Sequence, residues 1–147
     1  MNFAFNRGDS NAKVEYNRKI LSNIFGGKHI IFVNQIHSNN IYLFGGKQTK
    51  IVNADGIISK SSDSILAILT ADCAPIILIG KKFYGIIHAG WRGLVLDIIK
   101  KGVGLMTKYG EKLDEIKIIV GPHLGGNSFE VQKDFISNLK KFSDNED

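Results

Sequence analysis

Hydrophobic residues fall into short continuous runs in some parts of the chain and follow helical spacing in others. The clearest pattern is a pair of isoleucine-rich runs, Pro75–Ile79 and Phe83–Ile87, which are separated by Gly80-Lys81-Lys82. Short β-branched runs joined by a polar turn that contains glycine are typical of a β-hairpin. We therefore expect a hairpin near the middle of the chain, in which the start of the first strand lies beside the end of the second.

Apolar residues at helical spacing predict three helices. The first covers Ala12–Phe25, with Asn11 as its N-cap and a glycine pair at its end. The second covers Leu94–Tyr109, and the third covers Val131–Phe142. Further strands are predicted at Lys28–Ile36, Ile41–Phe44, Lys47–Val52, Ile65–Thr70 and Ile116–Val120, the last two of them buried, with a turn at Asn53–Gly56. Because several strands follow one another before a helix interrupts them, this order favours an α+β sandwich over a regular βαβ winding.

The composition is that of a globular domain. The chain has 147 residues, of which 44% are hydrophobic and 22% charged, and this length allows a sizeable core. A single cysteine, Cys73, rules out an internal disulfide and fits a reducing compartment. The first residues lack the apolar stretch of a secretory signal, and the longest apolar segment, Ile65–Ile79, is too short for a membrane span and contains Asp72. We therefore expect a cytoplasmic protein with no membrane partner.

The net charge of +5 raises the question of nucleic-acid binding. The lysines are dispersed, and no basic stripe with interleaved aromatic residues is present. The chain also lacks a Gly-x-Gly-x-x-Gly loop and a Walker-type loop, so the standard nucleotide-binding motifs are missing. We expect no nucleic-acid partner, although a weakly positive surface would attract ligands that carry phosphate.

Three residues with metal-binding side chains, His37, Cys73 and His88, each lie at the end of a predicted strand. Strand ends present side chains to a cleft, and the hairpin would bring Cys73 close to His88. Two imidazoles and a thiolate suit zinc, and three protein ligands leave a fourth position open, as in catalytic zinc sites. Taken singly, each residue also has a structural explanation, since a lone cysteine is usually a small buried hydrophobe and histidines at strand ends can bond backbone carbonyls.

Two further residues have both a chemical and a structural interpretation. Asp72 is either a turn residue or the partner that fixes a histidine tautomer. Arg92 either pairs with Asp97 on a helix surface or holds an anion at a helix N-terminus. A metal-free mechanism is also open, with Cys73 as the nucleophile and His88 as its base. The ligand set resembles a single blue-copper site as well, although the four histidines of the chain are too few for a multicopper oxidase.

Several short motifs stand in a recognisable order along the chain. They are Gln35-Ile36-His37-Ser38, Ala54-Asp55-Gly56, Thr70-Ala71-Asp72-Cys73-Ala74-Pro75, His88-Ala89-Gly90-Trp91-Arg92-Gly93, and Gly121-Pro122 with Phe129-Glu130-Val131. Together with the Asn17-Arg18 pair in the first helix, they resemble the YfiH-like family, long labelled multicopper polyphenol oxidoreductase or "laccase domain" proteins. The resemblance spans nearly the whole chain, and the Asp-Cys and His-Ala-Gly-Trp-Arg-Gly motifs are highly specific in combination.

This resemblance implies a fold, a metal and an activity. The fold is a layered α/β/β/α sandwich. The implied zinc ligands are His37, Cys73 and His88, with copper as the alternative metal. The implied reactions are phosphorolysis of adenosine, inosine or methylthioadenosine, and hydrolytic deamination of adenosine. We expect Arg92 to hold phosphate, and the catalytic set then consists of Cys73, His88, Asp72 and Arg92.

Two departures from the family pattern bear on activity. After Gly121-Pro122 the family commonly carries cysteines, whereas this chain has His123. Family members usually continue for several dozen residues more, so we expect residues 1–147 to be a single domain that lacks the family's C-terminal part. The alternatives to a zinc-dependent nucleoside enzyme are a copper-dependent polyphenol oxidoreductase, a metal-free cysteine hydrolase or amidase, and an inactive truncated remnant.

Overall fold

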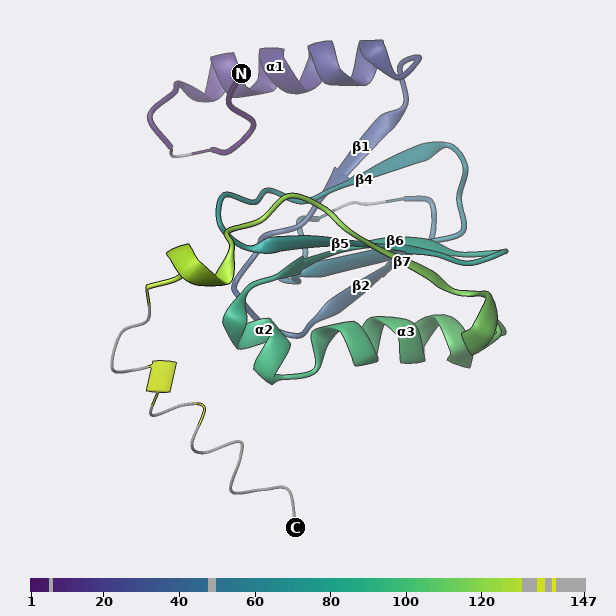
Figure 1. Cartoon of the computed structure of the whole chain (residues 1–147). Coiled ribbons are helices and arrows are strands. Elements are labelled where there is room, and N and C mark those ends of the chain that lie inside the picture. Colours follow the sequence, from purple (N-terminus) through teal and green to yellow (C-terminus); the bar gives the residue numbers. More distant parts are fainter. Residues whose placement is uncertain (6, 48–49, 131–134, 137–138, 140–147) are drawn as a thin grey trace.

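The computed structural model describes residues 1–5, 7–47, 50–130, 135–136 and 139 (Figure 1). Its helices are α1 (Asn11–Ile24), α2 (Trp91–Val95) and α3 (Ile98–Lys108), with short 3₁₀ helices at Leu113–Glu115 and Gly126–Ser128. Its strands are β1 (His29–Phe32), β2 (Ile41–Phe44), β3 (Gly56–Ser59), β4 (Ser64–Ala67), β5 (Ala74–Ile79), β6 (Tyr84–Ala89) and β7 (Lys117–Val120). Helices and strands are thus mixed in the way that the sequence predicts.

These elements stack in four layers, which Figure 1 shows from top to bottom. Helix α1 packs on the parallel pair β1–β4, and that pair packs on a five-stranded sheet of order β2-β3-β6-β5-β7. Helices α2 and α3 cover the opposite face of the larger sheet. The layered α/β/β/α sandwich is therefore confirmed.

Apolar residues fill the spaces between the layers, and strand β3 contributes to two of them. Ile57 packs towards β1 and β4, the adjacent Ile58 packs towards α3, and neither side chain is exposed. Successive residues of a strand point to opposite faces, so an apolar strand in this position is buried on both sides. Helix α3 comes closest to the sheet at Gly102, where a Cβ atom would lie 2.7 Å from the Cδ1 atom of Ile87. This close packing fixes β6, the strand that carries His88.

The predicted hairpin is confirmed. Strands β5 and β6 are antiparallel, and Pro75 lies opposite His88 in their register. Cys73 directly precedes β5, so its thiol and the His88 imidazole meet at the open end of the hairpin.

The closed end of the hairpin is held by a carboxylate from elsewhere in the chain. Glu111, which is 6% exposed, accepts hydrogen bonds from the backbone N–H groups of Lys81 at 3.0 Å, of Lys82, and of Phe83 at 2.7 Å. Burial alone would raise the pKa of Glu111, but these three N–H groups outweigh burial and hold the pKa below its ordinary value of 4.5. The folded state therefore favours the charged form of this side chain.

Glu111→Gln is expected to lower the melting temperature by several degrees at neutral pH, because the amide is a weaker acceptor and brings its own N–H₂ donors towards the turn. The folded pKa of Glu111 lies below its unfolded pKa, so its stabilisation is complete above about pH 4.5 and is lost as the pH falls through the lower value. Thermal unfolding should be measured at a series of pH values from neutral to strongly acidic. The difference in melting temperature between the parent and Glu111→Gln should become smaller as the pH falls. Glu130→Gln, at an exposed position, is the control, and a difference that stays constant with pH would contradict this role.

The prediction of one helix over Leu94–Tyr109 is wrong, because this stretch forms two helices. Helix α2 ends at Val95, α3 begins at Ile98, and Asp97 between them has a φ of 57°. A left-handed residue interrupts the helical hydrogen-bond ladder, and the apolar spacing continues across the break. Helix α1 is shifted by one residue from its prediction at both ends: Ser10 is the N-cap in place of Asn11, and the helix ends at Ile24 with Phe25 as its C-cap.

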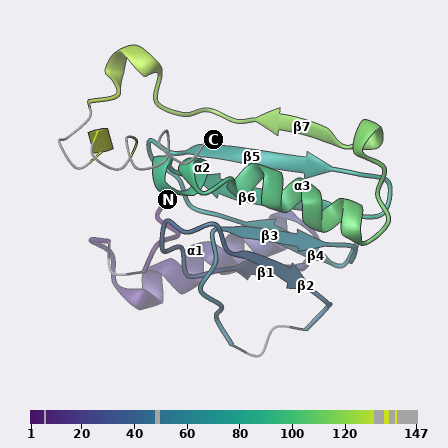
Figure 2. The ribbon, with the colours of Figure 1, turned by 90° about the horizontal axis from the view of Figure 1, so that it is seen from below.

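Several strand predictions also need correction. The strand predicted at Lys28–Ile36 ends at Phe32. The strand predicted at Ile65–Thr70 ends at Ala67 and is buried only at Leu66. Strand β3 is not among the predicted strands. The described residues of Lys47–Val52 form no strand. The stretch Ile116–Val120 does contain β7, but this strand lies at one edge of the sheet (Figure 2) and is not buried. Ile118 and Ile119 are each 48% exposed, and Ile77 of the neighbouring β5 is exposed as well. Apolar content alone predicted burial, whereas the edge position leaves β7 open.

The predicted helix at Val131–Phe142 falls mostly outside the described residues. The described positions within it, 135–136 and 139, are helical. No helix in the part of the chain that the structure describes is long and apolar enough to cross a membrane.

Candidate metal centre

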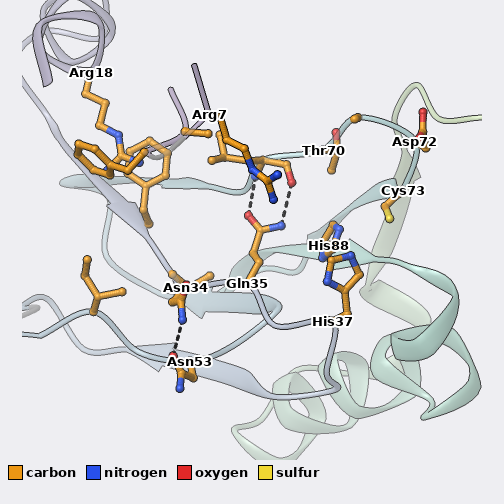
Figure 3. A pocket seen from close by; sticks show the side chains of 17 residues that line it. Arg7, Arg18, Asn34, Gln35, His37, Asn53, Thr70, Asp72, Cys73 and His88 are labelled. Atoms are coloured by element: carbon orange, nitrogen blue, oxygen red, sulfur yellow. Dashed lines mark hydrogen bonds between the residues drawn. The ribbon is translucent and has the colours of Figure 1, made fainter. Parts of the chain in front are cut away.

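Three side chains from separate parts of the chain meet at the open end of the hairpin (Figure 3). His37 follows β1, Cys73 precedes β5, and His88 lies in β6. One ligand atom from each residue lies within 4.8 Å of the other two, and the two imidazole rings are 4.9 Å apart at an angle of 82°. The structure therefore brings together the three residues that the sequence indicates as metal ligands.

The backbone of Gly90 lies against all three. A Cβ atom at this position would be 3.1 Å from the Sγ atom of Cys73 and 3.2 Å from the Cδ2 atom of His37. It would also be 3.7 Å from the Cε1 atom of His88, so a side chain here would enter the space that the three residues share. Gly90 is the N-cap of α2, and the missing side chain lets the start of this helix pass beside the centre.

A buried carboxylate orients His88. The Oδ1 atom of Asp55 lies 2.9 Å from the Nδ1 atom of His88; Asp55 is fully buried and His88 is 4% exposed. An imidazole that donates its Nδ1–H to a carboxylate presents the lone pair of Nε2 as a ligand. Carboxylate–histidine pairs of this kind commonly stand behind metal ligands, where they fix both the tautomer and the direction of the ring.

The same carboxylate holds the segment that carries His37. It accepts hydrogen bonds from the backbone N–H groups of Ile36 at 3.3 Å, His37 at 3.0 Å and Ser38 at 2.6 Å, and from the Ser38 hydroxyl at 2.8 Å. His37 has a φ of 56°, and successive N–H groups around a left-handed residue form a concave anion-binding site. Asp55 therefore positions two of the three metal-binding residues at once.

The surroundings set the protonation of Asp55 and His37. Burial would raise the pKa of Asp55, but the hydrogen bonds from Ser38 and His88 outweigh burial and hold this pKa below its usual range. Burial lowers the pKa of His37, and the nearby His88 and Arg92 lower it further, although the Asp55 carboxylate acts in the opposite direction. These surroundings favour an ionised Asp55 and a neutral His37, and neutral imidazole is the form that binds metal ions.

The environment of Cys73 does not favour a free thiolate. Burial raises the pKa of this thiol, and the negative charges of Asp72 and Asp55 raise it further. A protonated thiol is a poor nucleophile, so the metal-free reaction would begin from the wrong protonation state. A metal ion would provide the positive charge that Cys73 needs in order to release its proton.

The other two predicted site residues take different positions. Asp72 is exposed, and the carboxylate bonded to His88 is that of Asp55, so the tautomer-fixing role that the sequence allowed for Asp72 belongs to Asp55. Arg92 is exposed on α2 and stacks on Trp91, with 4.2 Å between its Cζ atom and the ring centroid. Its positive charge makes the smallest contribution to the lowered pKa of His37, and Arg92 is not among the residues that line the neighbouring cavity.

A cavity of about 940 Å³ lies beside the metal-binding residues, which form part of its wall together with Asp72. Gln35 fastens another part of this wall, as the dashed lines in Figure 3 show. Its Nε2 atom donates to the backbone oxygen of Leu69 at 2.8 Å, and its Oε1 atom accepts from the Leu69 N–H group at 2.7 Å. Small-molecule sites are commonly clefts of about 300–1,000 Å³. The cavity is therefore large enough for a small organic ligand beside the candidate metal centre.

Comparison with known proteins agrees with this arrangement. The sequence model of a family described as multi-copper polyphenol oxidoreductase laccase matches residues 1–147. The chain belongs to this laccase family.

Similar members of the laccase family carry the name of an enzyme. Purine nucleoside phosphorylase RP494 of Rickettsia prowazekii is 32% identical over 146 residues, which cover 93% of this chain and 60% of the relative. The purine nucleoside phosphorylase of Aquifex aeolicus is 37% identical over 112 residues, which cover 76% of this chain and 53% of the relative. The chain thus spans little more than half the length of the relatives it matches.

A solved structure shows the same fold. The crystal structure of Neisseria meningitidis protein NMB0706 is similar with a TM-score of 0.82 and 26% sequence identity. The match covers 92% of this chain and 55% of the other. This solved protein therefore shares the fold of most of the chain.

Proposed function

We propose that this laccase-family chain is a zinc-dependent purine nucleoside phosphorylase that acts on adenosine, inosine or methylthioadenosine, with adenosine deamination as a second reaction. The observation that carries the proposal is the meeting of His37, Cys73 and His88 on the wall of a cavity of about 940 Å³. The names of the relatives supply the substrate class, a purine nucleoside with phosphate. A nucleoside and a phosphate ion together suit a cavity of this size.

The donor set fits zinc. In a tetrahedral site with bonds of about 2.1 Å to nitrogen and about 2.3 Å to sulfur, the ligand atoms lie roughly 3.4–3.6 Å apart. The three ligand atoms here all lie within 4.8 Å of one another, so they need to move closer together to bind one ion, and His88 is backed by the Asp55 carboxylate. A zinc ion in this position supplies Lewis acidity and positive charge at the edge of the cavity.

Phosphorolysis needs two substrates to be held side by side. A phosphate oxygen forms a bond to C1′ of the ribose while the bond from C1′ to the base nitrogen breaks. The electron pair of the broken bond leaves with the base, which takes up a proton. We assign Arg92 to the phosphate because it lies two residues after Gly90, which contacts the three metal-binding residues, and because a guanidinium can donate two hydrogen bonds to phosphate. We assign Asp72, which lines the cavity beside Cys73, to a hydrogen bond accepted from the nucleoside.

Release of the free base tests this function. Adenine and ribose 1-phosphate are expected from adenosine when phosphate is present and not when sulfate replaces it, and the protein should contain about one zinc ion per chain. Arg92→Gln should raise the KM for phosphate by about tenfold or more and leave the KM for adenosine within about twofold, because one charge-assisted hydrogen bond is lost. Zinc-loaded protein that releases no base would overturn the phosphorylase proposal, and an unchanged KM for phosphate would overturn the role of Arg92.

The description of the family makes a copper enzyme the second candidate. Two imidazoles and a thiolate also suit a single copper ion, and consumption of oxygen with a phenol would identify such an enzyme. A cysteine hydrolase or amidase would keep its activity with a chelator and lose it on thiol alkylation, and an inactive protein would bind zinc without turnover. We place the activity in the cytoplasm, because a lone thiol that serves as a ligand needs reducing conditions.

A further inference from the structure

One wall of the cavity comes from the segment that precedes α1. Ala4, Phe5 and Arg7 of this segment line the cavity together with Arg18 of α1. Figure 3 shows Arg7 and Arg18 on one side of the cavity and the His37–His88 pair on the other. A ligand beside the metal-binding residues can therefore contact this segment as well.

Two neighbouring residues of α1 fasten the segment. The Nδ2 atom of Asn17 donates a hydrogen bond to the backbone oxygen of Asn2 at 2.7 Å. The Nε and Nη2 atoms of Arg18 both donate to the backbone oxygen of Phe3, at 3.0 Å and 2.7 Å. A planar guanidinium that donates twice to one oxygen fixes the direction as well as the distance of the contact.

The Arg18 guanidinium also connects the segment to the sandwich. Its Cζ atom lies 4.4 Å from the ring centroid of Phe5 and 3.8 Å from that of Phe32 in β1. Cation–π contacts of this kind are attractive, and both rings line the cavity. Arg18 thus joins α1, the segment and β1 at a single point on the cavity wall.

Hydrogen bonds within the segment connect its residues, so we expect them to move together. The Oδ1 atom of Asn2 accepts a hydrogen bond from the Ala4 N–H group at 2.8 Å, and its Nδ2 atom donates to the backbone oxygen of Arg7 at 3.0 Å. The residues that α1 holds, Asn2 and Phe3, are therefore tied to the residues that face the cavity. Release from Arg18 would displace this part of the wall.

We propose that Asn17 and Arg18 are positioning residues, which hold residues 2–5 and Arg7 in place as a cavity wall and thereby set the affinity for the nucleoside. The proposal rests on the proposed function for the identity of that ligand. A ligand that needs the docked segment binds only the molecules in which the segment is docked. Its apparent Kd is therefore the intrinsic Kd divided by the docked fraction. Loss of the two charge-assisted bonds from Arg18 shifts that docking equilibrium by about 10- to 100-fold.

Kinetics of the zinc-loaded protein test this role. Arg18→Met should raise the KM for adenosine by about tenfold or more, with kcat and zinc content within about twofold of the parent protein. Arg18→Lys keeps the charge without the planar fork, and Asn17→Ala removes one bond, so both should give smaller increases. Lys19→Met, at an exposed position of the same helix, is the matched control and should behave like the parent. Asn17→Ala carries the test alone if Arg18→Met does not fold.

Two measurements without turnover separate this proposal from the proposed function. Hydrogen exchange of the peptide that precedes α1 should be at least about tenfold faster in Arg18→Met than in the parent, because the docked wall opens more often. Calorimetric titration with adenosine should show the matching loss of affinity even if the parent releases no base. Unchanged exchange in a folded variant would overturn the docking role. Equal adenosine affinity in parent and variant would overturn the link to the cavity, and a parent that binds no adenosine would overturn both proposals.

Discussion

Alanine in place of Asp55 should lower the free energy of unfolding by about 3–5 kcal/mol, because it removes a buried carboxylate and leaves several buried donors without their acceptor. Asp55 is fully buried and accepts hydrogen bonds from the backbone of His37 and Ser38, and its carboxylate is bonded to the His88 ring. Each buried donor left without an acceptor costs about 1–3 kcal/mol. Urea-induced unfolding of the metal-free parent and variant measures the difference.

The same substitution should weaken metal binding by about 10- to 100-fold, the usual effect of losing the partner behind a metal ligand. Asp55→Asn, which keeps the shape and one acceptor oxygen, should show smaller losses of both stability and metal affinity. Ser38→Ala removes a hydroxyl that donates to Asp55 and accepts from the Asn40 N–H group, and should cost about 1–2 kcal/mol. A free energy of unfolding for Asp55→Ala within about 0.5 kcal/mol of the parent would show that Asp55 does not anchor this part of the fold.

Removal of any one of the three metal-binding side chains should abolish tight zinc binding. His37→Ala, Cys73→Ala and His88→Ala each leave two protein ligands, so the affinity should fall by more than the roughly 100-fold that follows loss of an outer partner. Competition with a chromophoric chelator measures the affinity. His29→Ala and His123→Ala are matched controls, because both histidines are exposed and lie outside the group.

His37→Ala and Cys73→Ala separate ligation from folding best, because His88 is buried and its loss would leave Asp55 without a partner. Both variants should keep the circular dichroism spectrum of the metal-free parent. If Cys73→Ala bound zinc as tightly as the parent, the Cys73 thiolate would not be a ligand of the metal. Copper in the purified parent, in place of zinc, would support the oxidoreductase alternative.

The hairpin and the three metal-binding residues could be predicted because each left a local signal. The hairpin has a short polar turn between two β-branched runs, and His37, Cys73 and His88 are metal-binding residue types at strand ends. The motif Ala54-Asp55-Gly56 marks Asp55 in the sequence, but no local pattern predicts its role behind His88. An aspartate before a glycine is typical of a turn, and its burial depends on backbone N–H groups that approach from another segment.

Two other features depend on tertiary arrangement in the same way. The break at Asp97 lies inside a stretch of helical apolar spacing, because both helices turn their apolar sides towards the same sheet. The residues of β7 are as apolar as those of a central strand, and only the strand order shows that they lie at an edge. Periodicity predicts the type of an element, whereas its neighbours decide how much of it is buried.

Among the residues that the structure describes, no strand pairs with the outer edge of β7. An edge strand exposes backbone N–H and C=O groups that can pair with a strand of a second molecule, and charged side chains are the usual protection against such pairing. In the sequence Lys-Ile-Ile-Val of β7, only Lys117 is charged. Self-association of the purified protein should therefore increase with concentration, and Ile119→Lys, which adds a charge to this strand, should reduce it.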